Sequence, residues 1–369
     1  MMESKCRIGP FIILVDERNK DGHDYPVLGI NKDKTFMPTA ANMAGIDTSK
    51  YKIVRKDTFV FSGMQTGRDV CIRIGLYNED TPALVSPAYT TFRLDTEKGI
   101  VPEFFFLNFN RDESDRYGAF ISDSSVRANL DWNRFLEIEI PLPPIAEQQK
   151  VVNAWKALRE IKEQNEEIAA PLMQVCQSYI QELKHKYECV EIGPYIIRFD
   201  DRNADNKIKI VKSVSVTKEF NDTNAKVDKS NLRTYKIVCP NQISFVQTTG
   251  NEKCLCAAIN HFGYPIVVTS VNEVFETNQD ILNPDYLHMW FRRKELDRYA
   301  RFHSWGSARE TFTWEDMKRV RIPLPPLSVQ QAIVNIYNCA NEAKKIAEKA
   351  DRMSREVCPA LIQHVINNN

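Results

Sequence analysis

The chain has 369 residues, of which 43% are hydrophobic and 27% charged, and its 49 basic and 49 acidic side chains give a formal net charge of zero. This composition is typical of a soluble globular protein of two domains, and no segment approaches the length and apolarity of a membrane span. The balanced charge argues against a protein that coats nucleic acid nonspecifically. It is compatible with sequence-specific readout by a few basic loops.

Residues 1–140 are predicted to form a mixed α/β or α+β head. Short β-rich runs alternate with polar turns, and helical stretches follow them near residues 101–109 and 112–120. The β-rich runs are residues 11–15, 58–61, 83–85 and 89–94. Residues 188–322 repeat this order, so we expect two similar heads.

A proline-rich phrase ends each head. Ile-Pro-Leu-Pro-Pro occupies residues 140–144 and returns at residues 322–326. Proline stops the last strand because it lacks the amide that a sheet needs and biases its predecessor towards extended geometry. Each phrase opens a helical segment, at residues 141–187 and 323–369, and each segment carries a Gln-Gln pair.

The two helical segments are predicted to pair as a coiled coil. Apolar residues recur in both at alternating spacings of three and four, the pattern of a coiled-coil seam. The seam residues are Val151, Leu158, Ile161, Asn165, Ile168 and Leu172 in the first segment and Ile333, Ile336, Ala340, Ala343, Ala347 and Ala350 in the second. One seam is bulky and the other rich in alanine, so they complement each other, and Asn165 would fix the register. The alternative is that each helix packs only on its own head.

The whole chain is an internal repeat. Matching residues are 184 apart near the start of the copies and 182 apart near their ends, so we expect one small insertion or deletion near residues 61–65. The matches include Asp115-Arg116-Tyr117 with Asp297-Arg298-Tyr299, and also Trp132 with Trp314, which we expect to anchor the two cores. A repeat this long predicts a pseudo-two-fold molecule that addresses a symmetric or bipartite partner.

The duplicated order of head, Ile-Pro-Leu-Pro-Pro phrase, Gln-Gln pair and seamed helix resembles the specificity subunit of type I restriction-modification systems. The resemblance covers essentially the full chain. It implies that residues 1–140 and 188–322 are target-recognition domains, each reading one half of a bipartite double-stranded DNA site. It further implies that residues 141–187 and 323–369 pair antiparallel, separate the heads and dock two methyltransferase subunits.

The same resemblance implies a non-catalytic chain that binds no cofactor itself. S-adenosylmethionine, ATP and Mg²⁺ are then expected on the partners, which are the methyltransferase subunits and the restriction and translocation subunit of the full complex. A scan for catalytic sequence supports this expectation. Residues 283–286, Asn-Pro-Asp-Tyr, superficially resemble the Asn-Pro-Pro-Tyr motif of amino-methyltransferases, but aspartate replaces the second proline and no glycine-rich loop precedes them. We expect them instead to cap a helix that begins at Pro284.

No metal site is predicted either. Cys254 and Cys256 are the only closely spaced pair among nine cysteines, and no second pair stands at zinc spacing, so buried or idle thiols are the simpler interpretation. Scattered thiols without a signal-peptide core fit a reducing cytoplasm.

Polar and basic residues in matching loops are candidates for DNA contact. Gln and Arg can make bidentate contacts to adenine and guanine edges, whereas Thr and backbone amides suit phosphate. The resemblance adds a Gly-Ser-x-Arg-like element, found at residues 306–309 and, with serine replacing glycine, at residues 124–127. The candidates are Gln65, Thr66, Gly67, Arg68, Arg127, Gln247, Thr248, Thr249, Gly250, Lys253, Ser307 and Arg309. The alternatives are ordinary polar turns and, for Arg127 and Arg309, internal salt bridges.

The preferred function is therefore sequence-specific DNA recognition within a type I restriction-modification complex. The alternative from another class is a two-headed scaffold that binds proteins and reads no DNA.

Overall fold

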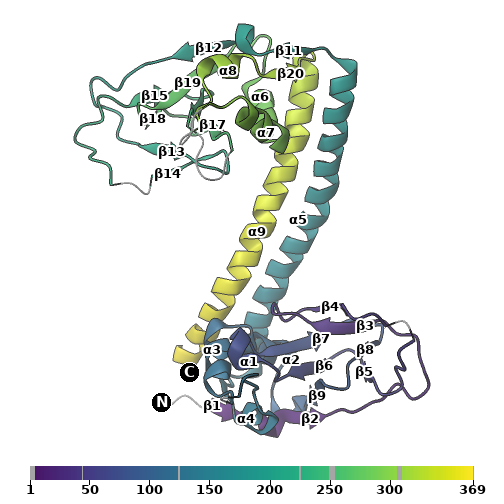
Figure 1. The fold of residues 1–369 in the computed structure, drawn as a ribbon. Helices are drawn as coiled ribbons and strands as arrows, with labels where there is room; N and C mark the ends of the chain where they lie inside the picture. The colour runs from purple at the N-terminus through teal and green to yellow at the C-terminus, as the bar shows by residue number, and fades with distance from the viewer. Residues whose placement is uncertain are drawn as a thin grey trace. The chain divides into compact units, whose positions relative to one another are not determined.

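The computed structural model describes residues 5–43, 45–123, 125–223, 226–248, 254–305 and 310–368. The chain divides into two compact units, one of Met1–Gln164 with Ile346–Asn369 and one of Asn165–Lys345. Each unit combines one head with parts of two 42-residue helices, α5 (Ile145–Lys186) and α9 (Leu327–Asn368) (Figure 1). In the described part of the chain, no helix has the length and apolarity to span a membrane.

The first head contains two four-stranded sheets, of order β2-β9-β6-β7 and β4-β3-β8-β5, and a β1-β10 pair. Among its strands only β3 and β8 pair in parallel. The strands are β1 (Lys5–Arg7), β2 (Ile12–Leu14), β3 (Val27–Ile30), β4 (Phe36–Pro38), β5 (Lys52–Val54), β6 (Thr58–Ser62), β7 (Arg73–Tyr77), β8 (Ala83–Val85), β9 (Thr90–Leu94) and β10 (Glu139–Pro141). The helical elements are η1 (Gly9–Phe11), α1 (Thr66–Asp69), η2 (Thr96–Lys98), α2 (Pro102–Phe109), α3 (Asp112–Phe120) and α4 (Trp132–Leu136). The two helices predicted near residues 101–120 are confirmed as α2 and α3.

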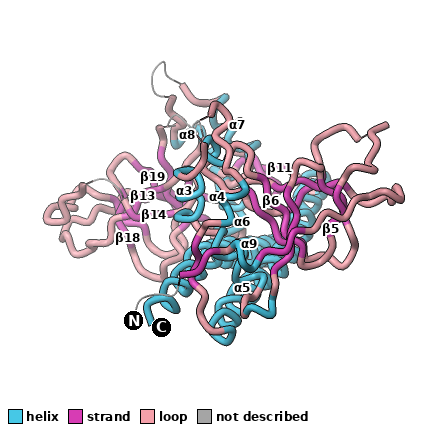
Figure 2. The backbone as a smooth tube through the Cα atoms, turned by 90° about the horizontal axis from the view of Figure 1, so that it is seen from below, coloured by secondary structure: helices cyan, strands magenta, loops and turns pink. Residues whose placement is uncertain are grey.

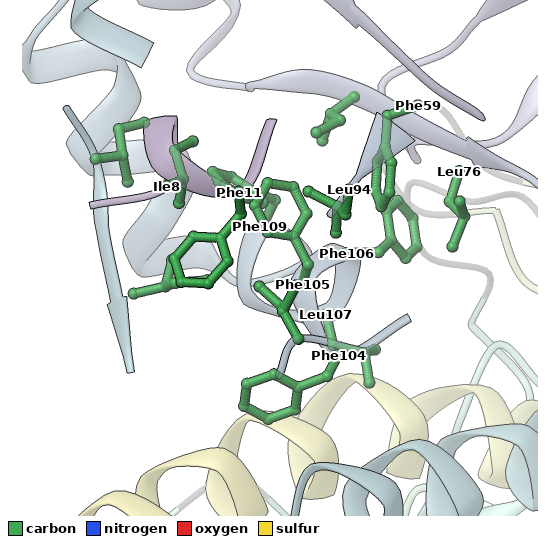
Figure 3. Packing of buried hydrophobic residues seen from close by; sticks show 14 of the residues in the cluster. Ile8, Phe11, Phe59, Leu76, Leu94, Phe104, Phe105, Phe106, Leu107 and Phe109 are labelled. Carbon is green, nitrogen blue, oxygen red and sulfur yellow. The ribbon is translucent and has the colours of Figure 1, made fainter. Parts of the chain in front are cut away.

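The core of the first head is rich in phenylalanine (Figure 3). The rings of Phe59 and Phe92 stack with centroids 5.0 Å apart, and Phe105 of α2 meets Phe59 edge-on at 5.1 Å. Such aromatic pairs contribute about 0.5–1.5 kcal/mol beyond the burial of their area. The same core includes Trp155 of α5 and Ile362 of α9, so the head and these helix segments share one apolar cluster.

The second head repeats the first of these sheets as β12-β19-β16-β17 and the terminal pair as β11-β20, and it has the pairs β13-β14 and β15-β18 in place of the second four-stranded sheet. Figure 2 colours the strands magenta and the helices cyan. Its strands are β11 (Cys189–Glu191), β12 (Ile196–Phe199), β13 (Lys212–Val214), β14 (Phe220–Asp222), β15 (Lys236–Val238), β16 (Ile243–Val246), β17 (Ala257–Ile259), β18 (Ile266–Val268), β19 (Asn272–Thr277) and β20 (Arg321–Pro323). Its helical elements are η3 (Gly193–Tyr195), α6 (Pro284–Phe291), α7 (Lys294–Phe302) and α8 (Trp314–Lys318). Both heads mix helix with mainly antiparallel sheet, which confirms the predicted α+β class. Trp132 and Trp314 are half-buried against the two cores, as expected.

Strand register corrects the predicted alignment of the repeats. Phe61 of β6 pairs with Ile74 of β7, and Phe245 of β16 pairs with Ala257 of β17. Phe61 and Phe245 are 184 residues apart, whereas Ile74 and Ala257 are 183 apart, so the first difference between the copies lies between β6 and β7 and between β16 and β17. The offset falls again to 182 before Val101 and Asn283, whose amides make matching hydrogen bonds described below. The expectation of one difference near residues 61–65 is therefore wrong. Two single-residue differences separate the copies, and each lies outside the sheet, where a change of loop length leaves strand register intact.

The two long helices run antiparallel within each unit. In the first unit, Lys162 Nζ lies 2.8 Å from Asp351 Oδ1, while Val151 near the start of α5 shares a core with Ile362 near the end of α9. In the second unit, Ile180 of α5 and Ile333 of α9 share the core of that head. Each helix therefore packs both on its neighbour and on a head.

The residues predicted for the seam are mostly buried on α9 but only partly buried on α5. On α9 the predicted residues Ile333, Ala340, Ala343, Ala347 and Ala350 are buried and Ile336 is half-buried. On α5 Val151 is buried and Leu158, Asn165 and Leu172 are half-buried, but Ile161 and Ile168 are 41% and 52% exposed. The buried hydrophobic residues of α5 are Val151, Val152, Trp155, Cys176, Ile180 and Leu183. Because head and neighbouring helix together decide which face is buried, the buried stripe departs from the strict two-helix seam that the spacing suggested.

Candidate nucleic-acid interface

In both heads, the segment before the last short helix crosses the end of a central strand. Leu130 donates its amide to the Gly63 carbonyl just after β6, and Phe312 donates to the Gln247 carbonyl just after β16, both at 2.8 Å. A Cβ on Gly63 would lie 2.0 Å from the Leu130 carbonyl oxygen, so only glycine allows this approach in the first head. The residues predicted to contact DNA lie on both sides of these crossings.

In the first head, the predicted loop at residues 65–68 is instead the helical turn α1. The Gly67 amide donates to the Ala128 carbonyl at 2.8 Å, and a Cβ on Gly67 would lie 2.8 Å from Ala128 Cβ. Thr66 is fully buried and its hydroxyl donates to the Gly63 carbonyl at 3.1 Å. Thr66 and Gly67 therefore hold α1 against the crossing segment, and the candidate role of the Thr66 side chain is corrected to a structural one.

Three cations from different elements surround Asp69 at the end of α1. Asp69 is contacted by Lys32 at 3.6 Å, by Arg68 at 3.4 Å and by Arg73. Burial of Asp69 opposes its ionisation, but the three cations prevail and hold the pKa of this carboxyl below its usual range. One carboxylate leaves a net positive cluster, and its Lys32 and Arg68 side chains are 62% and 60% exposed. This cluster can meet phosphate, and Gln65, which accepts a 2.9 Å hydrogen bond from Arg68, can reach a base edge beside it.

The segment with Arg127 is a loop closed by one carboxylate. Asp123 Oδ1 accepts hydrogen bonds from the Ser125 hydroxyl at 2.5 Å and from the Asn129 amide at 3.0 Å. These bonds, led by that of Ser125, hold the pKa of Asp123 below its usual range. The loop presents Val126, which is 99% exposed, beside the exposed Arg127. Ser125 thus shapes the loop, while Arg127 is available to a partner.

In the second head, the site is organised around Glu273. Arg198 donates to both oxygens of this carboxylate at 2.8 Å, and Gln247 Nε2 donates to it at 2.6 Å. Lys236 lies 3.4 Å away. The candidate Gln247 is thereby held by an internal partner, whereas Thr248 is exposed. The candidates Thr249, Gly250, Lys253, Ser307 and Arg309 lie outside the described residues.

A buried lysine–aspartate pair positions each site, and the sequence analysis missed its lysines. Lys34 Nζ lies 2.7 Å from Asp115 of α3, and Lys218 Nζ lies 2.6 Å from Asp297 of α7. The same aspartates accept hydrogen bonds from backbone amides just before β7 and β17, from Ile72 at 2.8 Å and from Leu255 at 3.0 Å. The sequence signal for these lysines was that Lys34 and Lys218 are 184 residues apart, the same offset as other matching residues near the start of the copies.

The first glutamine of each Gln-Gln pair clamps a head to its helix. Gln148 is fully buried, donates to the Gly99 and Pro143 carbonyls at 2.9 and 2.8 Å, and accepts the Val101 amide at 2.9 Å. Gln330 repeats all three bonds with Ile281 at 2.8 Å, Pro325 at 2.8 Å and Asn283 at 2.9 Å. This glutamine explains why the proline-rich phrase and the pair occur together.

The sequence features considered for chemistry have structural roles. Asn283 caps α6, which begins at Pro284 as predicted, by accepting the amides of Asp285 and Tyr286 at 2.8 and 3.1 Å. The Cys254 and Cys256 sulfurs lie 3.9 Å apart, and burial raises the pKa of the Cys256 thiol to about 12. Among the described residues, no three potential metal ligands gather.

Residues 11–170 and 195–338 match the family described as type I restriction modification DNA specificity domain. No curated protein sequence matches the chain significantly. The structure is similar to the crystal structure of a type I restriction-modification system S subunit from M. genitalium, at 10% identity and a TM-score of 0.66 over 99% of this chain and 96% of that chain.

Two further solved structures align over nearly the whole chain. The HsdS subunit from Thermoanaerobacter tengcongensis does so at 15% identity and a TM-score of 0.38, over 98% of this chain and 96% of that one. A structure that concerns complex assembly and conformational transition of the type I R-M system does so at 15% identity and a TM-score of 0.41, over 98% and 97%. TM-scores this low add nothing to the fold assignment.

Proposed function

Because the chain belongs to the family of type I restriction-modification DNA specificity domains and carries two copies of that domain, we propose that it chooses the DNA sequence on which a type I restriction-modification complex acts. Each head reads one half of a bipartite double-stranded site. The observation that carries the proposal is a shared framework with different side chains at matching positions. Both heads have the crossing segment, the lysine–aspartate pair and the glutamine clamp. At the strand end that the crossing segment meets, the first head has Gly63 where the second has Gln247, and Thr90 of β9 stands where β19 has Glu273.

The first head supports DNA contact most directly. Its exposed Lys32 and Arg68 suit phosphate, while Gln65 and Arg127 at the same surface have the donor geometry for base edges. In the second head, Thr248 and the candidates at residues 249–253 and 306–309 occupy the matching part of the sequence. Sequence discrimination then comes from the side chains that differ, and placement comes from the framework that is shared.

The long helices are proposed to dock two methyltransferase subunits. The exposed face of α5 in the second unit carries Ile168, Val175 and Tyr179, which are 52%, 41% and 45% exposed at spacings of seven and four. Apolar side chains repeated in this way suit the packing of another helix. Methylation, with S-adenosylmethionine, is proposed to belong to these subunits, and ATP- and Mg²⁺-dependent translocation and cleavage to a further subunit. This chain itself is proposed to be non-catalytic.

Comparing DNA methylation in cells with and without this chain tests the proposal. We expect a bipartite methylated motif that disappears on deletion and returns on complementation. Replacing residues 188–322 with the corresponding head of another specificity subunit should change one half of that motif and keep the other. An unchanged methylome after deletion would favour a protein-binding scaffold, and simultaneous change of both halves would overturn the assignment of one head to each half-site.

A further inference from the structure

Val126 lies in the loop of the first head that the Asp123 carboxylate closes, and its side chain is 99% exposed. An isopropyl group left in water gains nothing from folding. Single exposed apolar side chains are common on proteins, so the exposure of Val126 does not assign it a role by itself. The rigidity of the loop and the charges beside it do.

Backbone hydrogen bonds hold this loop in one conformation. The Asp123 amide donates to the Asn129 carbonyl at 2.8 Å, and the Ala128 amide donates to the Ser125 carbonyl at 2.9 Å, so Val126 is the second residue of a turn. Ala128 has a φ of +48°, a left-handed conformation that is strained for alanine and that these bonds maintain. Val126 is therefore in place before a partner arrives, and binding through it orders little additional chain.

Two further hydrogen bonds join the loop to α1. The Ala128 carbonyl accepts the Gly67 amide at 2.8 Å, and the side-chain oxygen of Asn129 accepts the Gln65 amide at 3.0 Å. Val126 and the cations at the end of α1 therefore belong to one surface of the first head.

The charged side chains on this surface favour an anionic partner. Arg127 is exposed, and Lys32 and Arg68 are 62% and 60% exposed. The two carboxylates beside them have internal partners. Asp69 is 9% exposed and contacts three cations, and one oxygen of Asp123 accepts three hydrogen bonds from the loop itself. An apolar side chain beside these cations suits an anionic partner that also presents an apolar group, and duplex DNA is such a partner.

The apolar group that base edges present in the major groove is the C5-methyl group of thymine. An isopropyl group has neither a donor nor an acceptor. Against cytosine it would lose the methyl contact and cover an amino group that needs a partner, and against a purine it would cover the N7 acceptor. The carbons of deoxyribose are apolar as well, but they are the same at every nucleotide. A valine in this position therefore favours thymine.

We infer that Val126 reads the C5-methyl group of one thymine in the half-site of the first head, by apolar contact in the major groove beside the phosphates that Lys32 and Arg68 meet. The inference rests on the proposed function and names a specificity-determining residue that the sequence candidates did not include. Ala308 is the sequence counterpart of Val126 in the second head and lies outside the described residues, so the inference concerns the first head.

The test uses the full chain and duplexes that carry its cognate site, taken from the methylated motif. Each thymine of the first half-site is replaced in turn by deoxyuridine, which removes the methyl group and keeps the base pair. The proteins are the wild type, Val126→Ser, which removes the apolar surface, and Val126→Ile, which keeps it. Val271→Ser is the matched control, because Val271 is 67% exposed and belongs to the second head. Fluorescence anisotropy measures DNA affinity, and native mass spectrometry counts bound methyltransferase subunits in parallel.

We expect deoxyuridine at one position to weaken binding by the wild type about 3- to 5-fold, as the loss of one buried methyl group does. Val126→Ser should weaken binding of the thymine duplex by a similar factor and should no longer distinguish thymine from deoxyuridine at that position. Val126→Ile and Val271→Ser should keep the distinction.

The inference is overturned if Val126→Ser binds the thymine duplex as tightly as the wild type does. It is also overturned if the variant and the wild type lose the same affinity at every deoxyuridine. A weakening by Val126→Ser that is the same with and without the methyl group would assign Val126 to the sugar-phosphate backbone. A change confined to subunit binding would assign it to a protein contact, and both results contradict the inference.

The wild-type chain separates this inference from the function beneath it. If it prefers its cognate duplex to one of scrambled sequence while Val126→Ser responds to deoxyuridine as the wild type does, only Val126 is misassigned. If the wild type shows no such preference, the proposed function fails and the inference falls with it.

Discussion

The two heads share their internal hydrogen bonds and differ in the charges at their sites. Each has a glutamine clamp, a buried lysine–aspartate pair and a crossing segment, with matching bonds that agree within about 0.2 Å. Around the candidate interface they diverge. Asp69 faces three cations in the first head, while Glu273 engages both Arg198 and Gln247 in the second. A repeat can thus keep the bonds that define its fold and vary the charged groups around its candidate interface.

The lysine–aspartate pairs provide the strongest test of a shared framework. Asp115→Asn and Asp297→Asn each leave a buried lysine without its charge partner, so we expect a loss of about 3–5 kcal/mol in the head that carries the change. Hydrogen exchange resolved by head measures this local free energy of unfolding. Asp112→Asn, on the exposed side of α3, is the control and should lower the free energy of unfolding by much less, about a few tenths of the loss caused by Asp115→Asn. A large loss in only one head would show that the two pairs have the same geometry but contribute differently to the free energy of unfolding.

Substitutions of the clamp glutamines are expected to cause the next largest loss of stability. Gln148→Ala removes the partners of one buried amide and two carbonyls, and we expect it to destabilise the first unit by about 3 kcal/mol. Gln330→Ala should do the same to the second unit. The adjacent Gln149 is exposed and bonds only Asn153 on its own helix at 2.9 Å, so Gln149→Ala is a matched control with little expected effect. Urea denaturation of the four proteins gives the comparison, and equal midpoints for Gln148→Ala and Gln149→Ala would contradict it.

One core position should make the heads respond differently to pH. His288 of α6 replaces Phe106 of α2, and burial, reinforced by the charges of Arg292 and His261, lowers its pKa to about 4 although the Lys218 and Ala257 carbonyls accept from its ring. Because the unfolded histidine takes up a proton near pH 6.5 and the folded one does not, stability is complete above that pH and declines as the pH falls towards 4. At pH 5 the second head should lose about 2 kcal/mol.

Thermal melting between pH 7 and 4.5, with hydrogen exchange to assign the head, measures this loss. The variant His288→Phe installs the residue of the first head and should remove the pH dependence specific to the second. If the first head shows the same decline, other groups dominate and the role of His288 is wrong.

The smallest expected difference concerns DNA affinity. Arg68 belongs to a net positive, exposed cluster, whereas Arg198 is held by both oxygens of Glu273. We expect Arg68→Ala to weaken binding of the cognate site by about 3- to 10-fold and to reduce the salt slope by about one, while Arg198→Ala changes affinity less than about twofold. Fluorescence anisotropy at several salt concentrations tests the contrast. An equal loss for both arginines would mean that the internal ion pair does not withhold Arg198 from phosphate.

Much of the organisation could be predicted because it depends on sequence patterns that extend over only a few residues. The repeat, the helices after each proline-rich phrase, α2, α3 and the start of α6 at Pro284 all follow from period, proline and capping. The candidate site was predicted less well. Thr66 and Gly67 were taken for loop residues that meet DNA, but they pack α1 against Ala128, and Gln247 was taken to be available although Glu273 holds it. Contacts between residues 26 to 61 positions apart leave no local signal.

The sequence by itself determined the two-fold repeat, the α+β class of the heads, the positions of the long helices and the seam of α9, because periodicity and proline act over a few residues. Only the tertiary structure decided which face of α5 is buried, how the offset between the copies falls in two steps and which candidate side chains remain exposed. It also brought Lys34 to Asp115 and Lys218 to Asp297 across about 80 residues of chain. These outcomes depend on which surfaces meet after folding, where burial and ion pairing outweigh local preference.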